Sequence, residues 1–258
     1  MKNKDIFKNK KDEKIIDAKI DIDDSDIRKN ILSIGLPVLC LSVLVVISMF
    51  LLFGDAKDNI NNHLADSIKF KQEYEKLNNQ DNSYGSSYLE INISKNNLIH
   101  YSSYSEVFEL LENGSGVIYF GFPECPWCRN LVPVLLDASI EAGIDNIYYL
   151  NNKEDRDIKK LDDDGNIIVE KEGTDNYFKL VEKLESVLES YEGVDEDVKR
   201  LYYPTVIFVK DGKIVDSHIG TLDSQTNPMV HLTDEQHKEL KDILVEKMQK
   251  TFICDSAC

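Results

Sequence analysis

Two cysteines separated by two residues are the part of this sequence best suited to chemistry. Cys125-Pro126-Trp127-Cys128 follows an apolar run directly and begins a stretch with helical spacing. Paired thiols at this spacing serve redox exchange or bind zinc. A helix that begins at Cys125 would direct unpaired backbone N–H groups and the positive end of its dipole at the sulfur. We therefore predict that Cys125 is the more acidic and more nucleophilic of the two thiols.

Hydrophobic patterns predict the elements that position this dithiol. The run Val117–Phe122 predicts a buried strand, and apolar spacing predicts a helix from Trp127 to about Ala142. A second strand is predicted at Asn146–Leu150, so that strand, helix and strand form a parallel βαβ unit. Further on, Thr205–Val209 and Lys213–Val215 flank an Asp-Gly pair, which predicts a β-hairpin.

Further elements are predicted on both sides of this unit. They are the alternating strand Leu89–Ile93, the strand-like Leu98–Tyr101, a helix Glu106–Leu111 capped by Ser105, an amphipathic helix marked by Phe178, Val181, Leu184 and Leu188, and a final helix from Thr233 to about Lys250. Gln236, three residues after Thr233, suits a capping box. Strands that alternate with helices indicate the α/β class.

The segment from about Asn151 to Arg200 is polar and acidic and interrupts this pattern. Within it, Asp162–Asn166 predicts a turn that leads into a short strand. A calcium loop is the alternative for that acidic run. Its register fails, because Lys160 and Lys171 would occupy the first and the bidentate ligand positions.

The uncharged apolar run Ile31–Phe53 predicts a single membrane anchor. As a helix its 23 residues would span about 34 Å, enough to cross a bilayer. A cleavable signal peptide is the alternative, but the run is long and no small-x-small pattern follows it. Residues 1–30 hold nine Lys and Arg, against three in the twenty residues after the run. We therefore expect a cell-membrane protein with a cytoplasmic N-terminus and an extracellular C-terminal part.

The chain divides into predicted parts: a disordered cytoplasmic tail at 1–30, the transmembrane anchor at 31–53, a stalk and linker at 54–87, a folded domain at 88–250 with an insertion at about 151–200, and a C-terminal tail at 251–258. The stalk has weak helical periodicity at Ile60, Leu64 and Ile68. The net charge of −17 argues against nucleic acid as a partner.

The residues around and after the dithiol resemble the thioredoxin superfamily. Pro133 lies eight residues after the first cysteine, where thioredoxins kink their active-site helix. Tyr203-Pro204-Thr205 looks like the family's cis-proline element, and Gly212 and Gly220 follow its proline by eight and sixteen residues, as in the thioredoxin pattern. The stretch Tyr119–Arg129 looks like the bacteriocin-transport-accessory branch, which comprises thioredoxin-like proteins of Gram-positive bacteria that are often membrane-tethered.

This resemblance implies a thioredoxin-like fold, a central mixed sheet flanked by helices, over about 88–250. It implies a thiol–disulfide oxidoreductase in which Cys125 attacks a disulfide and Cys128 resolves the mixed disulfide. No metal and no cofactor beyond the redox-active disulfide is implied. The expected substrate groove is lined by Pro126, Trp127, Tyr203, Pro204 and Thr205. The expected partners are a disulfide-containing protein or peptide and a separate redox protein that resets the dithiol.

One departure from the family concerns the proton of the second cysteine. Many thioredoxins place a buried carboxylate six residues before the first cysteine, and that position here is Tyr119. Proton transfer would then use Glu124, water or another group. The direction of the reaction, oxidising or reducing, stays open.

Two further cysteines, Cys254 and Cys258, end the chain. They suggest a second dithiol that relays electrons, a terminal disulfide clip, or thiols without a role. A zinc site built from all four thiolates is a further alternative. At the level of the whole protein, the alternatives are a thioredoxin-like docking module for secretion or assembly, with a non-catalytic disulfide, and a structural domain with an acidic surface.

Overall fold

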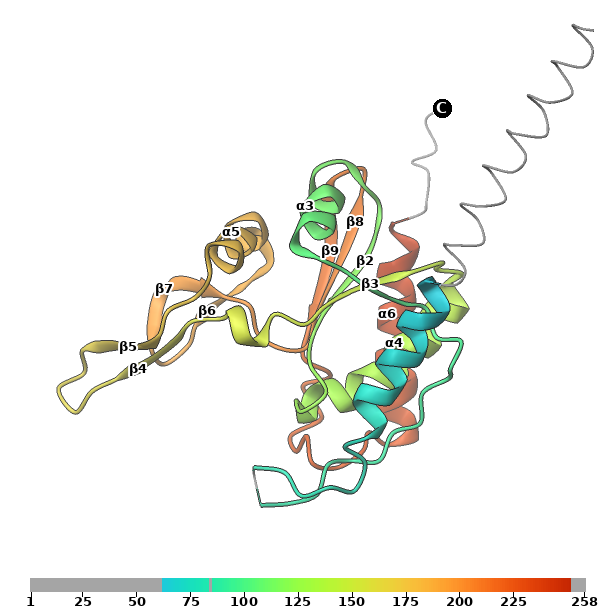
Figure 1. The fold of residues 1–258 in the computed structure, drawn as a ribbon, viewed down its shortest axis with the longest axis horizontal. Helices are drawn as coiled ribbons and strands as arrows, with labels where there is room; N and C mark the ends of the chain where they lie inside the picture. The colour runs from blue at the N-terminus through green and yellow to red at the C-terminus, as the bar shows by residue number, and fades with distance from the viewer. Residues whose placement is uncertain (1–61, 84, 252–258) are drawn as a thin grey trace, which may run out of the picture. The chain divides into compact units, whose positions relative to one another are not determined.

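The computed structural model describes residues 62–83 and 85–251 (Figure 1). The predicted cytoplasmic tail, the predicted anchor at 31–53, the first part of the predicted stalk, and Cys254 and Cys258 lie outside these residues. Within the described ranges, no helix has the length and apolarity needed to span a membrane.

The fold is α/β and is built on a five-stranded mixed sheet, as predicted. The strands lie in the order β1 (Ile99–Tyr101), β3 (Ile147–Leu150), β2 (Gly116–Phe120), β8 (Thr205–Lys210) and β9 (Lys213–Ile219). β1, β3 and β2 are parallel, whereas β8 runs antiparallel to β2 and β9 antiparallel to β8. All residues of the central strand β2 are buried. The dithiol follows this strand, so it lies at the carboxyl end of the middle of the sheet.

The helices that cover the sheet are α3 (Tyr104–Asn113), α4 (Pro126–Ala142), α5 (Asp175–Leu184), α6 (Asp234–Gln249) and the helical residues 62–75. The predicted capping box of α6 is present, with Thr233 bonded to the N–H of Gln236. The predicted cap of α3 is wrong by two residues. Ser103 caps this helix because only it lies three residues before Glu106 and can exchange hydrogen bonds with it.

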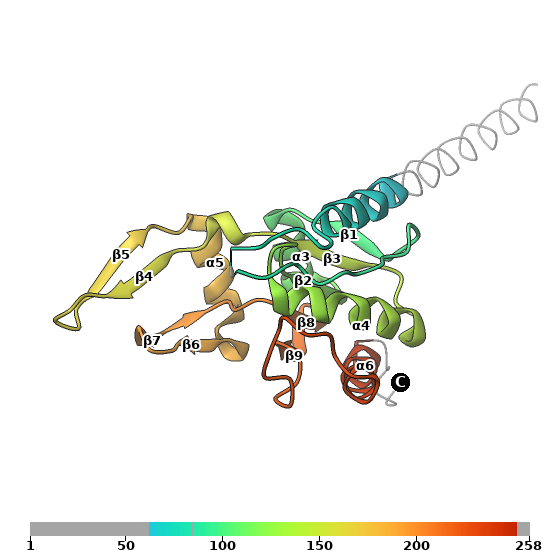
Figure 2. The same ribbon diagram turned by 90° about the horizontal axis from the view of Figure 1, so that it is seen from below.

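Alternate residues of β2 contribute to two separate cores, as the period of a strand requires. Val117 and Tyr119 belong to the core under α4, α6 and residues 62–75, whereas Ile118 and Phe120 belong to the core under α3 and α5. In Figure 2, α4 lies between residues 62–75 and α6. Since α4 follows β2 and precedes β3, the predicted parallel βαβ unit is confirmed.

The predicted hairpin around Asp211-Gly212 is also confirmed, since it joins β8 to β9. Both turn residues have positive φ, 50° and 73°, as a two-residue hairpin turn of this kind needs. Gly212 is required for a second reason. A Cβ atom there would lie 2.2 Å from the carbonyl oxygen of Glu112, so the loop packs against the end of α3.

The helical residues 62–75 are part of the packed domain rather than of a free stalk. Phe70 and Tyr74 are fully buried in the core shared with α4 and α6. The apolar pair that suggested helical spacing, Leu64 and Ile68, lies on the opposite side with 43% and 37% of its surface exposed. The domain therefore packs from before Tyr88, where we expected it to begin.

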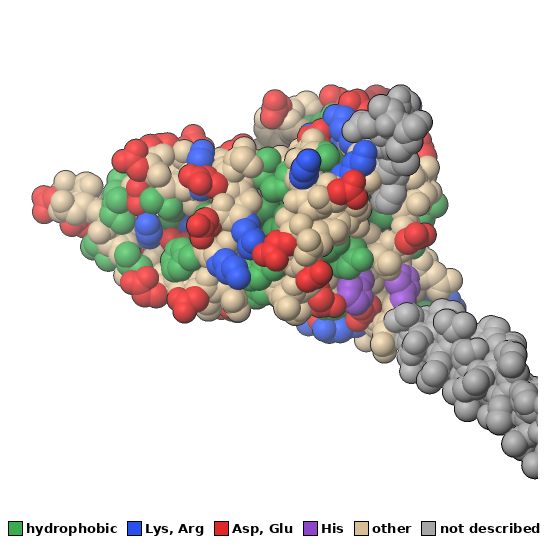
Figure 3. All heavy atoms as spheres, turned by 90° about the horizontal axis from the view of Figure 1, so that it is seen from above, with side chains coloured by type: hydrophobic (Ala, Val, Ile, Leu, Met, Phe, Trp, Pro, Cys, Tyr) green, Lys and Arg blue, Asp and Glu red, His purple; other side chains and the backbone are tan. Residues whose placement is uncertain are grey.

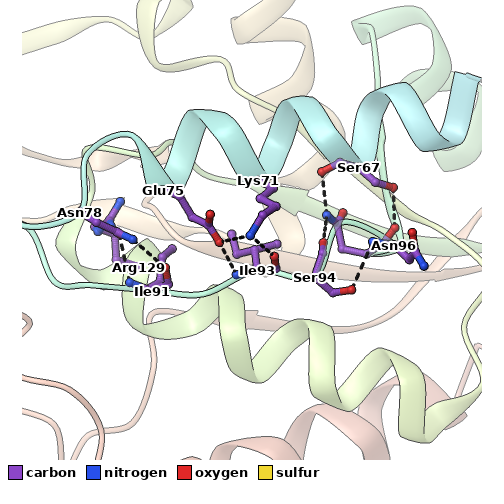
Figure 4. Close-up of polar contacts among 10 residues, drawn as sticks. Ser67, Lys71, Glu75, Asn78, Ile91, Ile93, Ser94, Asn96 and Arg129 are labelled. Carbon is purple, nitrogen blue, oxygen red and sulfur yellow. Dashed lines mark hydrogen bonds and ion pairs between the residues drawn. The ribbon is translucent and has the colours of Figure 1, made fainter.

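The predicted strand Leu89–Ile93 is wrong in type, although its alternation is real. Ile91 and Ile93 are buried as predicted, but the segment forms no ladder with any strand of the described residues. Side chains from the preceding helix and the turn after it supply the hydrogen bonds instead (Figure 4).

Three side chains satisfy the backbone of this extended segment. Asn78 both donates to the carbonyl of Ile91 (2.8 Å) and accepts from its N–H (3.1 Å). Glu75 accepts from the N–H of Ile93 (2.7 Å), and Lys71 donates to the carbonyl of the same residue (2.7 Å). Buried backbone groups must find partners, and here the partners come from a helix rather than from a neighbouring strand.

The insertion between β3 and β8 contains two hairpins and a helix. Its elements are the short helix η2 (Lys153–Asp155), the hairpin β4 (Ile158–Leu161) and β5 (Ile167–Lys171), α5, the short helix η3 (Glu185–Val187), and the hairpin β6 (Glu189–Tyr191) and β7 (Asp195–Arg200). The predicted turn at Asp162 is confirmed, since its carboxylate accepts the N–H groups of Asp164 and Asn166. The predicted helix is α5, which ends at Leu184. Leu184 and Leu188 are buried as predicted, but Tyr177 and Leu180 are also buried, whereas Phe178 is 44% exposed.

Apolar side chains are exposed on the β4–β5 hairpin. They are Ile158, Leu161, Ile167, Ile168 and Val169, each with about two fifths of its surface accessible. Figure 3 shows hydrophobic side chains, in green, interspersed with acidic ones, in red, toward the left end of the view. A two-stranded hairpin buries little on its own, so its attachment to the domain depends on contacts at its base.

Candidate functional site

Cys125 is the N-cap residue of α4. Its backbone is extended (φ −75°, ψ 118°), and its Sγ accepts the N–H of Cys128 at 3.2 Å. Pro126 follows at the first helical position, where its missing N–H costs nothing. Cys125 is 5% exposed and Cys128 is fully buried, and both are free thiols in this structure.

The two thiols have opposite electrostatic surroundings. Burial raises the pKa of Cys125, but hydrogen bonds from Cys128 and from the backbone N–H of Trp127, with the positive charge of Arg156, lower it further than burial raises it. Burial and the neighbouring Cys125 sulfur raise the pKa of the Cys128 thiol well above its usual value. This is the order of acidity that the sequence predicts. A thiolate at Cys125 beside a protonated Cys128 is the arrangement that nucleophilic attack needs.

The loop before β8 lies against the first cysteine. The Tyr203–Pro204 peptide bond is cis, and the Sγ of Cys125 donates to the carbonyl oxygen of Tyr203 at 3.7 Å. Thr205 is fully buried, and its hydroxyl donates to the carbonyl of Tyr202 at 2.8 Å. The structure therefore brings the predicted Tyr203-Pro204-Thr205 element to the dithiol. The Thr205 side chain bonds to the loop's own backbone.

The remaining predicted residues lie at the rim of the site. Trp127 is partly exposed beside the dithiol. Glu124 is also partly exposed, and its carboxylate lies 3.9 Å from the ammonium of Lys153. No hydrogen bond joins Glu124 to either thiol in the described part of the chain, so the structure offers no contact that would make it the proton acceptor of Cys128.

Buried tyrosines occupy the space below Cys128. The hydroxyls of Tyr74 and Tyr119 lie 3.0 Å apart, and both side chains are fully buried. A hydrogen bond from Tyr119 acts to lower the pKa of the Cys128 thiol, against the larger effect of burial. The ring of Tyr119 stacks on Tyr149 with centroids 5.4 Å apart. Gly121 leaves room for this hydroxyl, since a Cβ there would lie 2.1 Å from it.

Arg129, the residue after the second cysteine, is buried and has no acidic partner in the part of the chain that the structure describes. It is 1% exposed and donates five hydrogen bonds. The acceptors are the carbonyls of Leu89, Tyr74 and Pro123 and the side chain of Asn78, at 2.6 to 3.3 Å. Figure 4 shows the guanidinium beside Asn78, at the end of the helix of residues 62–75. Sequence reasoning missed this role, since no local pattern marks a buried arginine.

The base of the insertion also reaches the site, which the sequence did not predict. The hydroxyl of Tyr203 donates to Asn152 Oδ1 at 2.7 Å. The guanidinium carbon of Arg156 lies 4.9 Å from the centre of the Tyr203 ring, and the ring of Phe122 lies 5.2 Å from the same ring. The insertion thus contributes two polar side chains to the loop that contacts Cys125.

The chemistry that this arrangement supports is thiol exchange. Among the described residues, no group of three or more His, Cys, Asp or Glu side chains is placed to hold a metal ion. The predicted second dithiol, Cys254 and Cys258, lies outside the described residues. No family model matches the chain, and no curated protein matches it.

Proposed function

We propose that this protein is a thioredoxin-like thiol–disulfide oxidoreductase that acts on protein or peptide disulfides through Cys125 and Cys128. The observation that carries the proposal is the asymmetry of the two thiols. The first caps a helix and has a lowered pKa, and the second is buried with a raised pKa. Active dithiols of this type need one stable thiolate and one protected partner.

The topology supports the same proposal. A sheet in the order β1-β3-β2-β8-β9, with three parallel strands and an antiparallel hairpin, resembles the thioredoxin fold with an insertion before the fourth strand. The cis peptide before Pro204 lies beside the dithiol, as in that family. The bacteriocin-transport-accessory branch, the membrane anchor at 31–53 and the extracellular placement of the domain belong to the proposal on the sequence motifs alone.

In the reducing direction, the Cys125 thiolate attacks one sulfur of the substrate disulfide. A new S–S bond forms, the substrate S–S bond breaks, and the departing sulfur takes the electron pair and then a proton from water. Cys128 loses its proton and attacks the Sγ of Cys125, which releases the second substrate thiolate. The substrate has gained two electrons, and the enzyme holds a Cys125–Cys128 disulfide. The reverse sequence oxidises a dithiol substrate, and in either direction a separate thiol or disulfide protein must reset the enzyme.

Reduction of insulin disulfides by the full-length protein, with dithiothreitol as reductant, tests this proposal. The wild type should accelerate insulin precipitation, Cys125→Ser should abolish the acceleration, and the Cys254→Ser/Cys258→Ser double variant should keep part of it. If Cys125→Ser is as active as the wild type, the catalytic assignment is wrong.

The docking-module alternative is separated by trapping. Cys128→Ser should accumulate mixed disulfides between Cys125 and substrates in cells, because the resolving thiol is gone. The matched variant Cys125→Ser should accumulate none through this site. Equal yields of mixed disulfide in the two variants would favour a module whose dithiol is not catalytic.

A further inference from the structure

Arg156, at the base of the insertion near the dithiol, is a cation that pairs with no acidic side chain among the described residues. It follows η2 directly, and its guanidinium carbon lies 4.9 Å from the ring of Tyr203. The carbonyl of Tyr203 in turn contacts the Sγ of Cys125. Arg156 is partly exposed, so part of its side chain is open to solvent.

The neighbouring cations are already paired. Lys153 lies near Glu124, and Arg200 lies 3.3 Å from Asp157 with both side chains buried. Arg156 forms no ion pair with any described residue, and its Nε atom is buried without a hydrogen-bond partner among them. A partly exposed guanidinium that no described carboxylate pairs with can bind an added carboxylate through its terminal N–H groups, in a bidentate geometry that a lysine does not offer.

Three titratable groups interact with the charge of Arg156: the thiol of Cys125 and the hydroxyls of Tyr177 and Tyr203. The charge of Arg156 acts to lower the pKa of Cys125 and of Tyr203. Its field therefore reaches the sulfur that would react.

We propose that Arg156 binds a carboxylate of the substrate beside the target disulfide, so that the enzyme prefers disulfides flanked by an acidic residue. This inference rests on the proposed function. The whole chain carries a net charge of −17, so an acidic substrate is repelled by most of the surface. An acidic side chain is then tolerated only where it meets this guanidinium, which makes the contact selective.

A first experiment needs no catalytic turnover. Iodoacetate and iodoacetamide both alkylate a thiolate by forming an S–C bond with loss of iodide, but only iodoacetate carries a carboxylate. The rate constant of each reagent at Cys125 is measured in the full-length protein by peptide mapping at one pH. Both rate constants are proportional to the fraction of Cys125 that is a thiolate, so this fraction cancels in their ratio. A change in the ratio between variants therefore reports how the site interacts with the carboxylate of the reagent.

The variants are Arg156→Gln and Arg156→Lys. The matched control is Lys160→Gln on strand β4, which removes one positive charge from the same insertion by breaking the ion pair of Lys160 with Glu170. Arg156→Gln should lower the iodoacetate-to-iodoacetamide ratio about three- to tenfold, the range expected when one partly desolvated ion pair is lost. Arg156→Lys should retain much of the ratio, and Lys160→Gln all of it. An unchanged ratio in Arg156→Gln, or an equal fall in Lys160→Gln, would overturn the inference.

A second experiment tests substrates. Two short peptide disulfides that differ only in Glu or Gln beside one cysteine are compared by kcat/KM. The wild type should prefer the Glu peptide by about three- to tenfold, and Arg156→Gln should lose this preference. A preference that persists in Arg156→Gln overturns the inference but leaves the proposed function intact. Failure of the wild type to exchange with either peptide contradicts the proposed function itself, and the substrate preference that rests on it falls with it.

Discussion

Replacing the buried Arg129 should destabilise the domain more than its position on a helix suggests. Arg129→Met keeps a long apolar side chain but removes all five hydrogen bonds. Two acceptors keep other partners, since the carbonyl of Tyr74 also accepts from Leu77 and Asn78 Oδ1 also accepts from Ile91. The carbonyls of Leu89 and Pro123 accept no other hydrogen bond within the described residues, so they would lose their partner.

The magnitude follows from those two carbonyls. An orphaned buried acceptor costs about 1–3 kcal/mol, which gives about 2–6 kcal/mol for the pair. Leu89 is partly exposed, so water can reach its carbonyl and reduce its share. The substitution also removes a buried positive charge that is costly to desolvate, and this gain reduces the loss of stability further. We therefore expect Arg129→Met to lower the free energy of unfolding by about 2–4 kcal/mol. Arg129→Lys, with three donors, should lose about half of that.

Urea unfolding under reducing conditions measures the loss. Trp127 is the only tryptophan of the chain and lies two residues from Arg129, so its fluorescence reports the affected region directly. The matched control is Lys183→Met, which removes a partly exposed pair with Glu112 and should cost less than about 1 kcal/mol. Equal losses in Arg129→Met and Lys183→Met would refute the reasoning, because they would mean that the five hydrogen bonds contribute no more than one surface pair.

Three further outcomes follow from the buried groups. Tyr119→Phe removes a hydrogen bond that lowers the pKa of Cys128, so resolution of a trapped mixed disulfide should slow and shift to higher pH, measured by stopped flow across pH. Alkylation of Cys125 should continue at pH values where an ordinary thiol is protonated, while Cys128 stays unreactive, because their pKa values move in opposite directions. Burial and Lys247 lower the pKa of His218, so the unfolded state binds its proton first as pH falls. The free energy of unfolding should therefore fall as the pH drops below about 6.5, and it should fall less steeply in His218→Gln. Urea unfolding at a series of pH values measures both.

The dithiol could be predicted because its determinants are local. A strand, two cysteines at fixed spacing and a helix start are contiguous in sequence, and the N-cap geometry of Cys125 follows from them. The Asp211-Gly212 hairpin is equally local, since the turn conformation itself selects these residues. The patterns that identify both features lie within a few neighbouring residues, although both features also contact distant parts of the chain.

Apart from the cap of α3, the missed features depend on partners outside the local pattern. Leu89–Ile93 alternates like a strand, but its backbone groups form hydrogen bonds with two side chains instead of with a neighbouring strand. These are Glu75, at the end of the preceding helix, and Asn78, in the turn that follows it. In α5 the predicted face is correct at Leu184 but displaced by one residue in the first turns, because Tyr177 and Leu180 rather than Phe178 pack into the core. Periodicity shows that one side of an element is buried, but the neighbouring elements decide which side it is.

The tyrosine below the dithiol changes what the site is able to do with a proton. Burial raises the pKa of Tyr119 and of Tyr74 well above the usual value, so both hydroxyls stay protonated under any physiological condition. A neutral hydroxyl donates a hydrogen bond to a sulfur as negative charge develops on it, but it does not accept the proton as a carboxylate would. Under the proposed function, Tyr119 therefore stabilises the Cys128 thiolate without removing its proton. The proton of Cys128 must then pass to water or to another group, because a neutral tyrosine cannot take it up.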